Sequence, residues 1–280
     1  QIFLPHVYRW CRRRRIPFVA YVGTAHSLDS NFKSKVMNAL FAAGTLRIYK
    51  KNPVLAKTSA AKEELRQLGV PHAVIAPVGL DTAVLKKNIP ADEKMRLRKE
   101  HGFEADDVIL CNVSRLSWEK RPLELIDLFL QVKGKKKFKL IIVGNGPLEE
   151  ELNEKIRKNG LEKEVKIYPN VPYEKMWEIY EMSDYYLNMN KGEIFGMAIM
   201  EAVYYKTSVA AIRALGPSVT LKDMKGHKLC ENDDEMAEWI TGPYPSEKDL
   251  QESSEKMAST FTWDRCADAF LQASSEKSSR

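Results

Sequence analysis

The sequence lacks the features that mark membrane, disulfide-rich and metal-dependent proteins. No apolar run approaches the roughly 20 residues that a membrane span needs, and no secretory signal opens the chain. The four cysteines are scattered without C-x-x-C spacing, so neither a zinc site nor a disulfide framework is indicated. Aromatic residues are too sparse among the basic clusters to predict nucleic-acid binding. A reducing, cytoplasmic setting fits these absences.

The chain is long enough for more than one core. Its 280 residues suggest two domains at roughly 150 residues each, and 44% hydrophobic residues can fill them. A net charge of +6 favours anionic partners. Residue 1 is not an initiator methionine, and residues 1–5 do not form a targeting peptide. We therefore expect a fragment or a processed chain.

Strand-like apolar runs alternate with helical stretches along most of the chain. The run at residues 16–23 predicts a buried strand, residues 59–68 predict a helix with Ser59 as its N-cap, and a second alternation begins at the apolar run 107–113. Alternation of this kind indicates an α/β fold with parallel, doubly wound sheets. We expect domains at 1–88 and 89–260, and then a C-terminal helix at 261–280 that could cross back to the first domain.

The segment 191–202 joins a glycine-bearing turn to a predicted helix. Gly196 lets the backbone approach a ligand, and the helix after it would direct unpaired N–H groups toward an anion. Met197, Met200 and Tyr204 predict one buried face, which leaves Glu201 facing the mouth of a site. Alternatively, Glu193 and Glu201 only complement the helix dipole.

Two further segments place chemistry after predicted strands. Arg115 and Lys120 follow the strand at 107–113, where a parallel sheet binds its ligands, and could neutralise a diphosphate. They could equally be surface cations on a loop. Gly144 and Gly146 form a turn after the next strand, although a lone G-x-G is a weak nucleotide signal.

Taken in order, these segments resemble retaining nucleotide-sugar glycosyltransferases of the GT-B fold. The spacing of Glu193 and Glu201 is similar to the family's E-x7-E signature. Residues 114–121 resemble its G-R-x-x-x-x-K-G loop, with Ser114 and Arg121 in place of the glycines. Residues 143–147 resemble its V-G-x-G-P segment, and 168–172 resemble the loop that contacts the base. The resemblance covers roughly residues 108–212 and identifies the type known as glycosyl transferases group 1.

This resemblance implies a role for each matching residue. Glu193 would hold sugar hydroxyls, Glu201 would accept hydrogen bonds from the ribose, and Arg115 and Lys120 would stabilise charge on the leaving phosphate. The remaining donor-binding positions are Phe195, Gly196, Met197, Ala198, Gly144, Gly146 and Val171. The implied reaction moves a hexose from a nucleotide diphosphate sugar to a glycan, glycolipid or polysaccharide.

The match also has gaps. The sequence contains no Asp-x-Asp, which agrees with neutralisation by side chains, so we expect no cofactor and no required metal. The family's paired glycines after the strand at 208–212 are reduced to Gly216. The first domain lacks its early half, and His26 lies three residues beyond the usual histidine position. His26 could act beside the sugar, or it could be a loop histidine with no role.

Two basic clusters remain. Arg12, Arg13, Arg14 and Arg15 could seat the protein on an anionic membrane surface, as a peripheral protein on the inner face. For the lysine run at 133–137 a solvated charged face is preferred.

Two other functions fit the same sequence. A nucleotide-sugar epimerase of this fold would release nucleotide without an acceptor. A non-catalytic nucleotide-sugar binding module would bind a donor without turnover.

Overall fold

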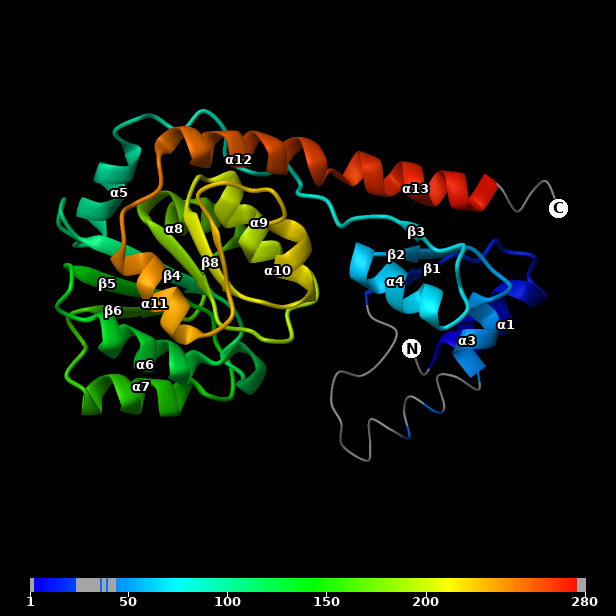
Figure 1. Cartoon of the computed structure of the whole chain (residues 1–280), viewed down its shortest axis with the longest axis horizontal. Coiled ribbons are helices and arrows are strands. Elements are labelled where there is room, and N and C mark those ends of the chain that lie inside the picture. The colour runs from blue at the N-terminus through cyan, green and yellow to red at the C-terminus, as the bar shows by residue number, and fades with distance from the viewer. Residues whose placement is uncertain (1–2, 24–35, 37–38, 40–43, 276–280) are drawn as a thin grey trace. The chain divides into compact units, whose positions relative to one another are not determined.

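The computed structural model describes residues 3–23, 36, 39 and 44–275. The chain forms two compact units (Figure 1). The first comprises Gln1–Gly79 and Phe261–Arg280, and the second comprises Leu80–Thr260. Within the described part of the chain, no helix combines the length and the apolar character that crossing a bilayer demands.

The first unit is built on a three-stranded parallel sheet with the order β1-β2-β3. Its described elements are α1 (Leu4–Arg13), β1 (Ala20–Val22), α3 (Leu46–Tyr49), β2 (Val54–Ala56), α4 (Ser59–Gln67), β3 (Val74–Ile75) and α13 (Trp263–Ser275). Leu55 and Ala76 pack against Cys266, Ala269 and Ala273 of α13. The last helix of the chain therefore completes the core of the unit that holds the first strands.

Helix α4 begins one residue earlier than expected. Thr58, and not Ser59, is its N-cap: Thr58 has extended backbone angles, and its hydroxyl accepts a hydrogen bond from the Ala61 N–H at 3.0 Å. The prediction of Ser59 was wrong because both residues carry a hydroxyl that can cap. Strand β2 ends at Ala56, which leaves Thr58 as the last extended residue before the helix.

The second unit contains a six-stranded sheet, parallel throughout, with the order β6-β5-β4-β7-β8-β9. Its strands are β4 (Val108–Val113), β5 (Phe138–Val143), β6 (Val165–Tyr168), β7 (Tyr185–Asn188), β8 (Ser208–Ile212) and β9 (Lys228–Cys230). The chain order reverses direction between β4 and β7. In open parallel sheets, ligands bind beyond the carboxyl ends of the strands at such a reversal.

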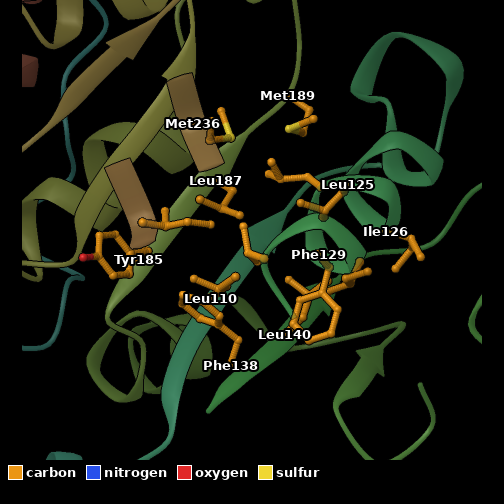
Figure 2. Close-up of a cluster of buried hydrophobic side chains, with 14 of the residues drawn as sticks. Leu110, Leu125, Ile126, Phe129, Phe138, Leu140, Tyr185, Leu187, Met189 and Met236 are labelled. Atoms are coloured by element: carbon orange, nitrogen blue, oxygen red, sulfur yellow. The ribbon is translucent and has the colours of Figure 1, made fainter. Parts of the chain in front are cut away.

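Helices cover both faces of this sheet (Figure 1). They are α5 (Glu93–Glu100), α6 (Pro122–Val132), α7 (Glu149–Lys158), α8 (Met176–Met182), α9 (Met197–Tyr204), α10 (Leu215–Thr220), α11 (Asp233–Thr241) and α12 (Glu247–Thr260), with 3-10 turns η2 (Trp118–Lys120) and η3 (Tyr173–Lys175). On one face, Leu125 and Phe129 of α6 and Met236 of α11 pack on Leu110 and Leu187 of the sheet (Figure 2). The doubly wound α/β class expected from the sequence is confirmed.

The glycine turn after β5 packs closely against the loop after β4. A Cβ atom on Gly144 would lie 2.0 Å from the Ser114 carbonyl oxygen, and one on Gly146 would lie 2.4 Å from that of Leu116. The Leu116 N–H donates to the Asn145 carbonyl oxygen at 2.8 Å. Only glycine permits this approach, so the turn fixes the loop that carries Arg115 and Lys120.

We expect Gly144→Ala to destabilise the protein more than Gly134→Ala. Both glycines have a positive φ, but no atom lies within 4 Å of a Cβ on Gly134. Gly134→Ala should therefore cost only the backbone strain, about 1–2 kcal/mol. Gly144→Ala should cost about 1–3 kcal/mol more through overpacking. Urea denaturation measures both, and equal losses would contradict the close approach.

Candidate functional site

The carboxyl ends of β4 and β7 bring a cation and a carboxylate together. Lys120 lies in η2, which follows β4, and Glu193 lies in the turn that follows β7. The Lys120 Nζ is 2.8 Å from Glu193 Oε2, and both side chains are largely shielded, with 25% and 15% exposed. The two residues are far apart in the sequence, and the strand order alone makes them neighbours.

Buried asparagines shape the turn that carries Glu193. The Asn112 amide donates to the Leu187 carbonyl oxygen at 2.8 Å, which joins β4 to β7. Asn190 Oδ1 accepts from the Gly192 N–H at 2.9 Å, and its Nδ2 donates to Glu193 Oε2 at 3.2 Å. The roles of these amides were not predicted from the sequence. Their signal was an asparagine in the apolar strand 108–113, because a buried amide needs partners.

The same turn is held from its other side by Gly216. The Gly216 N–H donates to the Glu193 carbonyl oxygen at 2.8 Å, and a Cβ on Gly216 would lie 2.5 Å from the Phe195 backbone nitrogen. Phe195 itself is buried. Gly216, the one glycine present where the family has two, therefore packs against the turn that carries Glu193.

Helix α9 begins at Met197 behind Gly196, which has a φ of +85°. This left-handed backbone favours glycine, and a Cβ on Gly196 would also lie 2.8 Å from Ile199 Cδ1, so the Ile199 side chain would have to shift. Met197 and Ala198 form the first turn, as the sequence predicts. Their N–H groups belong to the helix end that favours an anion.

Glu201 is buried, which corrects its predicted place at the mouth of the site. The predicted apolar stripe was wrong: Met197 is exposed, while Ile199 to Val203 are all buried and Glu201 is only 8% exposed. Periodicity failed because almost every residue of α9 is apolar, so the helix is buried on nearly all sides.

Two tyrosines hold the Glu201 carboxylate. The Tyr180 hydroxyl donates to Oε2 at 2.8 Å, and the Tyr173 hydroxyl donates to Oε1 at 3.4 Å. The ring of Tyr180 stacks on Tyr205 at 5.9 Å between centroids. Glu201 is thus fixed by one strong and one long hydrogen bond, and the long one comes from a half-exposed residue.

The pKa values of the two glutamates are displaced in opposite directions. Burial raises the pKa of Glu201, and the tyrosine hydrogen bonds offset only part of that rise. Burial would also raise the pKa of Glu193, but the hydrogen bonds and charge from Lys120 and Asn190 outweigh it, so that this pKa is lowered. Glu193 is therefore held as a charged group, and Glu201 is penalised for its charge.

Arg115 does not join the Lys120–Glu193 pair. Its exposed guanidinium is 2.7 Å from Glu119 Oε1, and this hydrogen bond lowers the pKa of Glu119 to about 2. The Asn145 amide, between Gly144 and Gly146, donates to the Pro169 carbonyl oxygen at 3.1 Å. The turn after β5 thereby contacts the loop that contains Val171. His26 lies outside the described residues.

No group of three or more His, Cys, Asp or Glu side chains that could hold a metal ion occurs among the residues that the structure describes.

Known proteins resemble the chain in sequence and in fold. The D-inositol 3-phosphate glycosyltransferase of Mycobacterium avium is 26% identical, over 94% of this chain and 65% of that protein. The alpha-monoglucosyldiacylglycerol synthase of Streptococcus pneumoniae is 24% identical over 49% of this chain and 32% of its own length. The chain thus spans less than two thirds of these relatives.

In structure, the chain is similar to Anabaena HepE, solved in complex with UDP-glucose. The TM-score is 0.77 at 19% identity, over all of this chain and 77% of that one. This likeness, with those to other glycosyltransferases, shows the GT-B fold. The sequence model of the family "Glycosyl transferases group 1" matches residues 93–257. This range includes β4 to β9 and both signature glutamates, Glu193 and Glu201. The chain belongs to this glycosyltransferase family.

Proposed function

We propose that the protein transfers a hexose from a nucleotide diphosphate sugar, with retention of anomeric configuration, to a glycan, glycolipid or polysaccharide. The observation that carries this proposal is the Lys120–Glu193 pair beside the start of α9, at the strand reversal of the second unit. HepE is solved with UDP-glucose, so this sugar nucleotide is the first donor to test.

Each group has a task in this reaction. Breaking the bond between the anomeric carbon and the diphosphate oxygen leaves negative charge on the diphosphate. Lys120 and the N–H groups at the start of α9 stabilise that charge. Glu193, whose lowered pKa keeps it ionised, accepts hydrogen bonds from sugar hydroxyls. Retention requires the acceptor oxygen to bond to the anomeric carbon on the face that the diphosphate leaves, and the acceptor's hydroxyl proton passes to the departing diphosphate oxygen.

The proposal includes no metal and no cofactor. An ammonium on one strand end and a helix N-terminus on the next already supply positive potential to a diphosphate. A divalent ion would duplicate this role. The donor sugar nucleotide is therefore the only small molecule that the reaction needs besides its acceptor.

Calorimetric titration with UDP, GDP, ADP and their hexose conjugates tests the donor site. We expect one nucleotide to bind selectively, and Lys120→Ala to weaken its binding roughly tenfold or more, since a hydrogen bond to a charged group is worth about 1.5–3 kcal/mol. EDTA should change nothing. Product analysis by NMR should show the donor's anomeric configuration.

The control for this experiment is Arg96→Ala, which removes another cationic side chain of the same unit. Arg96 is half exposed and pairs with Glu93 on α5, and such surface pairs contribute little. The affinity of Arg96→Ala for the nucleotide should match that of the wild type. Loss of binding in EDTA would contradict the metal-free site, and an inverted product would contradict retention.

The negative charge of Glu201 should lower the stability of the folded protein but favour donor binding. We propose that Glu201 accepts hydrogen bonds from the ribose, for which its buried charge is needed. Its raised folded-state pKa means that its contribution to stability is present at acid pH and is lost as the pH rises through that value. At neutral pH and without a bound nucleotide, the buried charge of Glu201 therefore lowers the stability of the folded protein.

Two isosteric variants test this with opposite signs. At neutral pH, Glu201→Gln should raise the melting temperature, by about 2–4 °C for each kcal/mol relieved, and weaken nucleotide binding roughly tenfold or more. Glu193→Gln should lower the melting temperature, because the lowered pKa of Glu193 adds stability above its ordinary value of 4.5. The Glu201→Gln difference should shrink on acidification to about that pH, whereas the Glu193→Gln difference should shrink only below it, as the pH falls through the lowered pKa of Glu193. Thermal denaturation at several pH values measures both differences. Shifts of the same sign would contradict the assignment.

We also propose that α1 seats the protein on an anionic membrane surface. Phe3, Val7 and Trp10 recur along one side of the helix and are 76%, 50% and 50% exposed. The Arg14 guanidinium lies 4.6 Å from the Trp10 ring centroid. The run Arg12, Arg13, Arg14 and Arg15 is exposed throughout. Aromatic side chains beside a basic run are typical of a helix lying in a lipid interface.

Vesicle sedimentation with and without anionic lipid tests this surface. Replacing the four arginines with alanine should lower partitioning at least about 100-fold, since each basic residue near the surface contributes about 1 kcal/mol. The control replaces Lys133, Lys135 and Lys137, which are exposed on the second unit. Equal losses in both variants would show only a net-charge effect, and no loss would contradict the proposal.

A further inference from the structure

Arg121 adopts a backbone conformation that side chains rarely adopt. Its φ and ψ are 55° and 48°, in the left-handed region that favours glycine. It is the N-cap residue of α6 and directly follows Lys120. An arginine in this position is strained, and such strain persists where surrounding contacts fix it.

The Arg121 side chain supplies those contacts. Its Nη1 and Nη2 atoms lie 3.1 and 2.8 Å from the two carboxylate oxygens of Asp233, which is a bidentate pair. Nη1 also donates to the Met189 carbonyl oxygen at 3.4 Å, and Nε lies 3.4 Å from Glu124. The guanidinium is largely buried, with 15% exposed.

These contacts join the two segments that carry the Lys120–Glu193 pair. One segment is η2 and the start of α6, where Lys120 immediately precedes Arg121. The other begins at Met189 and continues to Asn190, whose amide donates to Glu193. Asp233, the first residue of α11, anchors the guanidinium between them. Arg121 touches neither Lys120 nor Glu193 through its side chain, yet it ties down the backbone on both sides of the pair.

We propose that Arg121 is a positioning residue, which with Asp233 sets the geometry in which Lys120 meets Glu193. The left-handed backbone directs Lys120 toward the end of β7, and the bidentate pair keeps that turn in register with the turn of Glu193. Arg121 thus serves the transfer step without contacting the donor. This inference depends on the proposed function for its effect on catalysis, but its effect on geometry can be measured alone.

A set of three variants separates positioning from stability. Arg121→Gly keeps the turn without strain and removes the side-chain contacts. Asp233→Asn leaves Arg121 in place and removes the charge that orients it. Lys206→Gly is the matched control, because Lys206 also has a left-handed backbone, with a φ of 60°, but is exposed and follows the C-terminal end of α9, whereas Glu193 precedes the start of that helix. Thermal denaturation verifies that each variant folds.

The first readout does not require activity. Carbon NMR of the side-chain carboxyls, assigned with Glu193→Gln, should show the pKa of Glu193 rising by about one unit in Arg121→Gly and Asp233→Asn, the lower end of the effect of one nearby charge. The pKa of Glu193 should stay unchanged in Lys206→Gly. The second readout is kinetic: kcat should fall roughly tenfold to a hundredfold in the first two variants, as small misplacements do.

The outcomes divide cleanly. A folded Arg121→Gly protein that keeps both the Glu193 pKa and kcat would overturn the inference and leave Arg121 a structural tie. Equal losses of kcat in Lys206→Gly would overturn it as well. A shifted Glu193 pKa in a protein whose wild type transfers no sugar would support the positioning role and contradict the proposed function.

Discussion

The parallel pairing of β4 with β7 is the constraint on which the candidate site depends. Their register aligns Leu110 with Tyr185 and Cys111 with Tyr186, and the chain runs outward from this pair in both directions across the sheet. Because both strands end at one edge, whatever follows them must meet there. Lys120, Glu193 and the start of α9 are those following segments. The core beneath, formed by strand residues and by α6 and α11, fixes the edge itself (Figure 2).

The two signature glutamates show how one helix and its preceding turn can prepare carboxylates for different tasks. Glu193 has a cation and an amide beside it, so it stays charged at little cost. The Glu201 carboxylate accepts hydrogen bonds from the Tyr180 and Tyr173 hydroxyls, and burial still disfavours its charged form. The empty protein is therefore less stable around Glu201 than it could be. Such a trade between stability and function is common where a site must bind polar groups.

Much of the fold could be predicted from the sequence, because apolar runs bounded by turns define buried strands. The bounds of β8 agree with the predicted strand at 208–212, and β4 lies within the predicted run 107–113. The family resemblance singled out Lys120 and Glu193. The N-cap of α4, the burial of Glu201 and the partner of Arg115 could not be predicted. Each depends on which of several possible contacts forms in the folded protein. The helix could be capped by Thr58 or by Ser59. Glu201 could face Tyr180 or solvent, and Arg115 could pair with Glu119 or with a bound anion. Local sequence does not rank such alternatives.

The packing of α13 on β2 and β3 imposes an order on biosynthesis. Leu55 and Ala76 leave the ribosome long before Cys266 and Ala269, the side chains that cover them. The second unit, Leu80–Thr260, lies between in the chain and holds all its own core residues. It can therefore fold while the nascent first unit still exposes apolar strand surface. The emergence of α13 ends that exposure, so until α13 is made the strands of the first unit need protection from aggregation.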